Sequence, residues 1–102
     1  MPMGERVLEK LVRETTMEIK NAEGLHMRPA MKFIDLASRF NCKITVRNGP
    51  HEADGKSIMQ MSMLEATCGT RLQVRAEGSD ADQALEALRD LVEVQMFGEP
   101  PP

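Results

Sequence analysis

The chain has 102 residues, with 13 Lys and Arg against 16 Asp and Glu, and its formal net charge is −3. This length suits one domain with a modest core. The mild acidity and the three aromatic residues, all Phe, argue against a nucleic-acid binder, which usually has a basic surface and aromatic stacking platforms.

Membrane insertion and disulfide bonds are not expected either. No apolar run approaches the roughly 20 residues that a membrane span needs, and the N-terminus lacks the apolar segment of a secretion signal. Cys42 and Cys68 lie far apart and form no Cys-x-x-Cys pair, which gives a disulfide framework little support. We therefore expect a cytoplasmic protein with both thiols reduced.

The start of the chain predicts an extension followed by a strand. Residues 1–14 are charged and have apolar residues at helical spacing, which fits a short amphipathic helix and a frayed extension equally well. From residue 15 to 20 the pattern alternates, with Thr15, Met17 and Ile19 on one face. This alternation predicts the first strand.

The next element is a helix over residues 27–40, where apolar residues recur at helical intervals. Pro29 falls in the first turn, where a missing N–H costs nothing because early helical donors lack intrahelical acceptors. The helix is therefore expected to begin almost at His26. Asn41 is a suitable stop for it.

A hairpin and a short second helix follow. Alternation over residues 42–47 predicts a second strand, Asn48-Gly49 predicts a turn, and residues 51–53 would return as a short third strand. Ser57 has Gln60 three residues later, the pattern of a capping box, so a helix is expected over residues 58–64.

The last predicted elements are a strand, a helix and a tail. Residues 72–77 alternate as a fourth strand, and Ser79 is expected to cap a final helix whose apolar face runs from Ala81 to Val92. Residues 98–102 form a tail rich in proline, and its last three residues, Pro100-Pro101-Pro102, cannot continue a helix and are expected to be disordered. This element order predicts an α+β domain whose helices cover one face of a sheet.

His26 has the neighbours that a phosphoryl acceptor needs. A neutral imidazole is a nucleophile near pH 7, and a helix start offers free N–H groups and a positive dipole end to an anion. Arg28 could add charge-assisted hydrogen bonds. The spacing alone also fits an exposed loop histidine beside a solvated arginine. The only other histidine, His51, is expected to have no role, and no metal or cofactor site is expected.

Two motifs then indicate a family. Gly24-Leu25-His26-Met27-Arg28-Pro29-Ala30 resembles the active-site motif of HPr, the histidine-containing phosphocarrier of the bacterial phosphoenolpyruvate-dependent sugar phosphotransferase system. Lys56-Ser57-Ile58-Met59, about thirty residues downstream, resembles the regulatory-serine motif of that family. The resemblance covers residues 15–94.

The resemblance implies a fold and a set of roles. The fold would be an open-faced β-sandwich, a four-stranded antiparallel sheet covered on one face by three helices. His26 would be phosphorylated at Nδ1, Arg28 would stabilise the phosphate, and Ser57 would be the target of an HPr kinase/phosphorylase. The other partners would be Enzyme I and sugar-specific IIA domains, which a monomer would meet through an apolar surface made of Gly24, Met27, Ile58, Met59 and Met63.

Several points depart from the family pattern or stay open. Met27 and Met31 stand where the family mostly has small or polar residues, and the extension over residues 1–14 has no counterpart in a minimal member. Met59 and Met63 can share a helix face, either as a contact patch or as core. Ser57 could cap its helix, be phosphorylated, or do both.

Three functions are compatible with these features. The first is a phosphocarrier in which residues 15–97 form the HPr-like domain. The second is a regulatory binding module, nitrogen-related or in catabolite control, that acts through Ser57. The third is a small-ligand-binding domain, which a large closed apolar pocket would favour.

Overall fold

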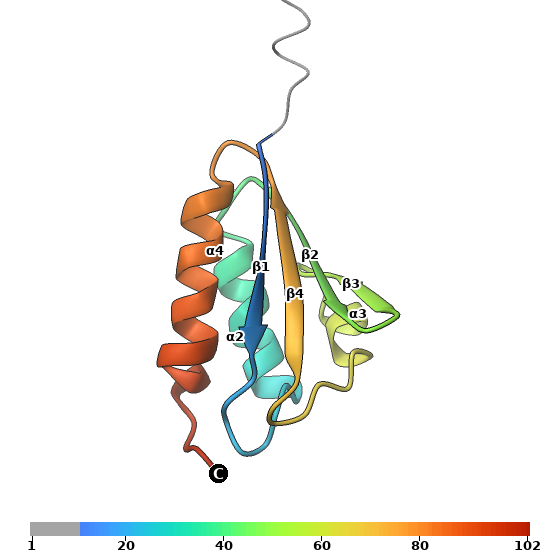
Figure 1. The fold of residues 1–102 in the computed structure, drawn as a ribbon, viewed down its shortest axis with the longest axis vertical. Helices are drawn as coiled ribbons and strands as arrows, with labels where there is room; N and C mark the ends of the chain where they lie inside the picture. Colours follow the sequence, from blue (N-terminus) through green and yellow to red (C-terminus); the bar gives the residue numbers. More distant parts are fainter. Residues whose placement is uncertain (1–10) are drawn as a thin grey trace, which may run out of the picture.

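The computed structural model describes residues 11–102, and the expectations for residues 1–10 fall outside this part of the chain. The order strand, helix, strand, strand, helix, strand, helix is the expected one (Figure 1). The elements are β1 (Val12–Glu18), α2 (Met27–Ala37), β2 (Lys43–Asn48), β3 (His51–Asp54), α3 (Ile58–Ser62), β4 (Arg71–Glu77) and α4 (Ala81–Arg89).

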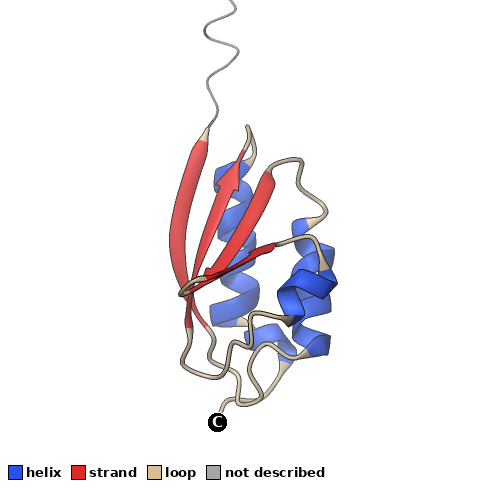
Figure 2. Cartoon of the chain, turned by 90° about the vertical axis from the view of Figure 1, so that its right-hand side faces the viewer, coloured by secondary structure: helices blue, strands red, loops and turns tan. Residues whose placement is uncertain are grey.

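The four strands form one antiparallel sheet in the order β1-β4-β2-β3. The three helices lie on one side of this sheet, and the other side carries none (Figure 2). The predicted α+β open-faced sandwich is therefore confirmed. Within residues 11–102, no helix has the length and the apolar character needed to cross a membrane.

The core lies between the sheet and the helices. In the central strands β2 and β4 buried residues alternate with residues on the open side, as the sequence pattern predicts, so that Ile44, Val46, Leu72 and Val74 are almost fully buried. On the helix side, Phe33, Leu88 and Phe97 are the large side chains that pack against them; the remaining large buried residues are Met17, Ile19, Met61, Leu64 and Val92.

The first strand begins at Val12, three residues before the expected start at Thr15. Val12 pairs with Glu77 and Glu14 with Arg75, so the ladder with β4 runs along the full length of both strands. The interpretation of residues 12–14 as part of a helix or a frayed extension is therefore wrong. Local helical spacing was misleading because a ladder partner more than sixty residues away decides the conformation of these residues.

The N-cap position of the last helix is held by Asp80 and not by Ser79, and the Asp80 side chain makes no capping hydrogen bond. The Asp80 carboxylate accepts hydrogen bonds from the backbone N–H groups of Asn41 at 2.8 Å and Cys42 at 3.0 Å. The bond from Asn41 is the main reason why the pKa of Asp80 lies below its usual value. Asp80 thus fastens the connection between α2 and β2 to the start of α4.

The thiol of Cys42 is buried beside Asp80. Burial, and then the neighbouring Asp80, raise the pKa of Cys42 to about 11. Cys68 is exposed, and both cysteines are free thiols. In the described part of the chain, no three His, Cys, Asp or Glu side chains gather as metal ligands would.

The chain beyond α4 returns to the start of α2. The helix widens over Asp90–Val94, and a short turn of 3-10 helix over Met96–Gly98 buries Phe97 in the core. Lys32 Nζ donates to the Phe97 carbonyl at 2.7 Å, and the Ala22 N–H donates to the Pro100 carbonyl at 3.2 Å. Disorder was expected for residues 100–102, and this is wrong for Pro100, which is held by the hydrogen bond from Ala22.

Candidate functional site

His26 is the N-cap of α2, as the position of Pro29 predicts. Its backbone is extended, with φ −84° and ψ −169°, and its carbonyl accepts the first helical hydrogen bond, from the Ala30 N–H at 2.9 Å. The His26 side chain does not cap the helix. The ring is therefore left free for other contacts at the helix start.

The first turn of α2 offers open hydrogen-bond donors. The N–H groups of Met27 and Arg28 have no acceptor within residues 11–102, and Pro29 has no N–H at all. A helix start with unsatisfied N–H groups and the positive end of the dipole is a ready anion site. Two free amides therefore stand next to the His26 ring.

Arg28 is exposed and forms no ion pair with any described residue. Its guanidinium is attached to the same first turn as the two free amides. Because no described carboxylate pairs with the Arg28 guanidinium, the guanidinium is available to bind an anion at the helix start.

The His26 ring contacts a residue that sequence reasoning missed. Its Nε2 lies 3.2 Å from both carboxylate oxygens of Glu99, and 42% of the His26 side chain is exposed against 14% of the Glu99 side chain. His26 Nδ1 has no partner in the described part of the chain. The C-terminal end lies at the same end of the molecule as the loop between β1 and α2 (Figures 1 and 2).

The loop before His26 is held by a close approach at Gly24. Gly24 is buried and has φ +77°, and a Cβ there would lie 2.7 Å from the carbonyl oxygen of Ala66. The same oxygen accepts a hydrogen bond from the Leu25 N–H at 2.8 Å. The close neighbours of Gly24 are therefore Ala66 and Thr67 of the same chain. The expected contact between Gly24 and a partner protein stays a prediction.

Ser57 is the N-cap of α3, as predicted, and its Oγ accepts a hydrogen bond from the Gln60 N–H at 3.3 Å. The reciprocal half of the capping box is not formed. Gln60 Oε1 instead accepts from the Asp54 N–H at 2.8 Å. Ser57 is half-buried and caps a helix of only five residues.

Comparison with known families bears on both motifs at once. Residues 13–94 match the family model described as "PTS HPr component phosphorylation site". The chain belongs to the HPr family.

Relatives and solved structures agree with this assignment. The chain is 45% identical over 75 residues to the phosphocarrier protein HPr of Pseudomonas aeruginosa, a match that covers 72% of this chain and 83% of that protein. It is 40% identical over 76 residues to the phosphocarrier protein NPr of Proteus mirabilis, with 74% and 84% covered. The crystal structure of HPr from Thermoanaerobacter tengcongensis superposes with a TM-score of 0.81 at 42% identity and covers 85% of this chain and 97% of that one.

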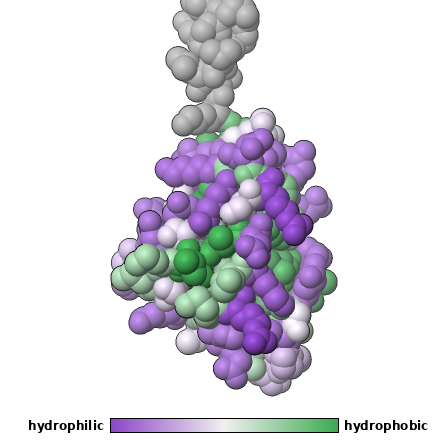
Figure 3. Space-filling view, turned by 180° about the vertical axis from the view of Figure 1, so that it is seen from behind, coloured by the Kyte–Doolittle hydropathy of each residue, from purple (hydrophilic) through white to green (hydrophobic). Residues whose placement is uncertain are grey.

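Exposed methionines are a distinctive feature of this HPr-family chain. Met27 and Met31 on α2 are 56% and 50% exposed. Met59 on α3 and Met63 directly after it are 76% and 72% exposed, while Met61 is fully buried. The expectation that Met59 and Met63 share an exposed face is thus supported, and their interpretation as core is wrong. Seen from the side opposite to Figure 1, apolar side chains gather among hydrophilic ones (Figure 3).

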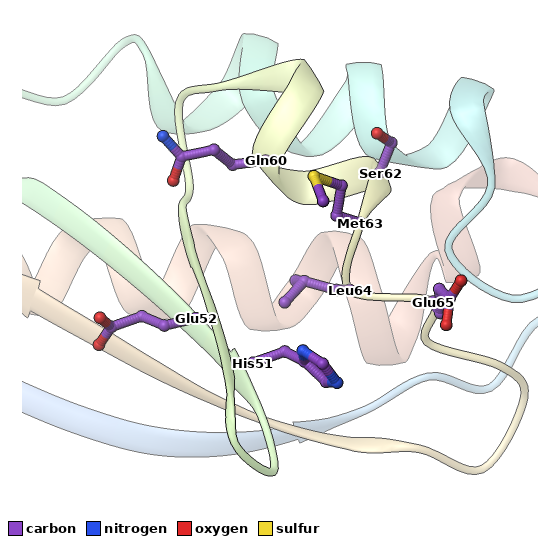
Figure 4. A pocket seen from close by; sticks show the side chains of 7 residues that line it. All are labelled: His51, Glu52, Gln60, Ser62, Met63, Leu64 and Glu65. Carbon is purple, nitrogen blue, oxygen red and sulfur yellow. The ribbon is translucent and has the colours of Figure 1, made fainter.

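A sizeable hollow in the described part of the chain lies away from His26, which does not line it. Its volume is about 550 Å³, and it is a half-open hollow between β3 and α3 (Figure 4). It is lined by His51, Glu52, Gln60, Ser62, Met63, Leu64 and Glu65. Because it is open and has charged residues in its wall, it lacks the enclosed apolar character that would favour a small-ligand-binding domain.

Two residues outside the motifs, Glu99 and Asn21, join the polar contacts around His26. The fully buried Asn21 donates from Nδ2 to Glu99 Oε1 at 3.0 Å and to the Gly24 carbonyl at 2.8 Å. No motif pointed to Glu99, because it lies 73 residues after His26. The sequence signal that could have indicated a packed C-terminal segment was Phe97, a large apolar residue that is buried in the structure.

Proposed function

We propose that this HPr-family chain is a monomeric phosphocarrier that accepts a phosphoryl group on His26 from Enzyme I and passes it to IIA components in sugar uptake. Its main support is the start of α2, where His26 Nδ1 and the N–H groups of Met27 and Arg28 have no hydrogen-bond partner within residues 11–102. The chain would be a substrate of other proteins' active sites and would need no metal or cofactor of its own.

The chemistry is a direct transfer to Nδ1. The Nδ1 lone pair attacks the phosphorus, and the bond between phosphorus and the donor breaks with its electron pair returning to the donor. The phosphoryl oxygens then lie where the N–H groups of Met27 and Arg28 and the Arg28 guanidinium can donate to them. The partial exposure of His26 lets a partner's active site reach the ring.

Docking is assigned to the exposed apolar side chains around the two motifs. Met59 on α3 and Met63 directly after it are exposed, as is Met27 on α2 next to His26. Ile58 is half-buried against the core. Methionine side chains are flexible and polarisable, so they suit a surface that meets more than one partner. Such a surface fits a carrier that must bind a donor and then an acceptor.

The proposal is tested by incubating the purified chain with phosphoenolpyruvate, Enzyme I and then a IIA domain. We expect acid-labile phosphate on the chain and its passage to the IIA domain. If the wild-type chain stays unlabelled, the carrier function is wrong. If it is labelled but no IIA domain of the sugar branch accepts the phosphate, the sugar-uptake assignment is wrong.

Replacing Arg28 by alanine is expected to slow phosphorylation by about tenfold to a hundredfold. Hydrogen bonds to charged groups contribute about 1.5–3 kcal/mol each, and each 1.4 kcal/mol is a factor of ten. The phosphorylation rate of Arg28→Lys should lie between those of the wild type and Arg28→Ala, because a lysine keeps the charge but loses the planar guanidinium. The initial rate of labelling by Enzyme I measures the effect.

Arg39→Ala is the matched control for Arg28→Ala. Arg39 is exposed and follows the other end of α2, about 16 Å from its start at 1.5 Å per residue. Arg39→Ala removes the same positive charge as Arg28→Ala, so a general electrostatic effect would slow phosphorylation of both variants alike. Equal rates for the two variants would contradict the role given to Arg28.

A regulatory role through Ser57 is the alternative function. Its support is the position of Ser57 at a helix N-terminus, where added phosphate is electrostatically favoured, and the similarity to NPr as well as to HPr. It predicts that an HPr kinase/phosphorylase labels Ser57 and that His26 is dispensable for partner binding. Binding of the candidate regulator to the His26→Ala and Ser57→Ala variants separates the two functions.

A further inference from the structure

We propose that Glu99 is a positioning residue for the phosphoryl acceptor: its carboxylate fixes the proton of the His26 ring on Nε2 and directs the nucleophilic lone pair to Nδ1. The consequence for phosphoryl transfer rests on the proposed function. The effect on the ring itself does not, and it is measured on the unphosphorylated chain.

The C-terminal segment is anchored so that Glu99 faces His26. Phe97 is buried in the core, and its carbonyl accepts a hydrogen bond from Lys32 Nζ at 2.7 Å. On the other side of Glu99, the Pro100 carbonyl accepts the Ala22 N–H at 3.2 Å. With an anchor on each side, the position of the Glu99 backbone is set by the fold and not by the ring.

The carboxylate itself is held by Asn21. Asn21 is fully buried, and its Nδ2 donates to both Glu99 Oε1 and the Gly24 carbonyl. Asn21 therefore ties Glu99 to the loop that leads into His26. Because only 14% of the Glu99 side chain is exposed, water screens its charge less than it would on an open surface.

The hydrogen-bond inventory then decides the tautomer of His26. An ionised carboxylate has acceptors only, so the ring atom 3.2 Å from both of its oxygens has to be the donor. In a neutral imidazole one nitrogen is protonated and the other carries the lone pair. With the proton on Nε2, the lone pair lies on Nδ1, which is the nitrogen without a partner.

The same contact stabilises the product of the transfer. When the Nδ1 lone pair forms the P–N bond and the donor bond breaks, no proton leaves the ring. The ring gains a positive charge that it shares with Nε2–H, and the Glu99 carboxylate lies against that N–H. The arrangement is the one in which the aspartate of a Ser-His-Asp triad holds its imidazole in one tautomer and stabilises the imidazolium.

The first experiment measures the tautomer of the neutral ring in the free chain by long-range ¹H–¹⁵N correlation NMR. We expect the Nε2–H form in the wild type and a detectable Nδ1–H fraction in Glu99→Gln, since an amide can also donate to Nε2. Glu23→Gln is the matched control: Glu23 is exposed in the same loop and has no hydrogen bond or ion pair within residues 11–102. Identical tautomer populations in the wild type and Glu99→Gln would overturn the proposal.

The second experiment measures steady-state phosphorylation of the same variants by Enzyme I. We expect Glu99→Gln to lower kcat by about tenfold, the lower end of the effect that partners orienting a histidine have in metal sites, with KM unchanged. Glu23→Gln should match the wild type. A raised KM with unchanged kcat would make Glu99 a docking contact and overturn the positioning role. An unlabelled wild type would instead overturn the proposed function and leave the tautomer result standing.

Discussion

Replacing His26 by alanine is expected to abolish phosphorylation by Enzyme I, because no other side chain at the start of α2 offers a nitrogen lone pair. The chain contains one other histidine, His51, which lines the hollow between β3 and α3. His51→Ala is therefore the matched control and should be labelled at the wild-type rate. Labelling with radioactive phosphoenolpyruvate, followed by mild acid treatment, measures both variants.

The loss of labelling in His26→Ala should not come from unfolding. The His26 side chain does not cap α2, and its polar contact is with Glu99. The backbone carbonyl that starts the helix is kept in the variant. Circular dichroism should therefore match the wild type. Labelling of the variant, or retained labelling at another residue, would show that the acceptor lies elsewhere.

Gly24→Ala is expected to reduce the free energy of unfolding by about 3 kcal/mol, by a backbone clash added to conformational strain. The new Cβ would lie 2.7 Å from the Ala66 oxygen and 2.9 Å from Cα of Thr67. Both are backbone atoms that cannot rotate away. Relieving the clash would also disturb the hydrogen bond between Leu25 and Ala66, so phosphorylation of His26 should fall as well.

Gly49→Ala separates the two contributions. Gly49 also has a positive φ, +60°, in the turn between β2 and β3, but a Cβ there meets nothing within 4 Å. This variant should lose about 1 kcal/mol, from the left-handed backbone alone. Urea denaturation of both variants gives the difference. Equal losses would show that the approach of Gly24 to Ala66 and Thr67 contributes nothing to stability.

Local pattern was enough to predict most of the fold. Alternation around Ile44 and Val74 identified two central strands, and helical spacing around Phe33 identified α2. Pro29 located the helix start at His26, and Ser57 was recognised as a cap. These patterns predict structure well because each involves residues close together in the sequence, so that neighbouring residues alone determine the helix, strand or cap.

The remaining features depend on distant partners. Ser79 has a suitable side chain for an N-cap, but Asp80 takes that position and binds the backbone of Asn41 and Cys42, almost forty residues earlier. The contact of Glu99 with His26 spans 73 residues. No periodicity or short motif can show such a pairing, because it exists only after the sheet has brought the two segments together.

One consequence of the sheet order concerns how the protein folds. β1 precedes the acceptor site, yet its ladder partner in the sheet is β4, with Val12 opposite Glu77. Pairings this far apart in sequence raise the contact order and slow folding. The acceptor site also takes contacts from Ala66 and Glu99, so the His26 loop has its full set of contacts only after both distant segments have packed against it. We therefore expect the hydrogen bonds around His26 to form late in folding.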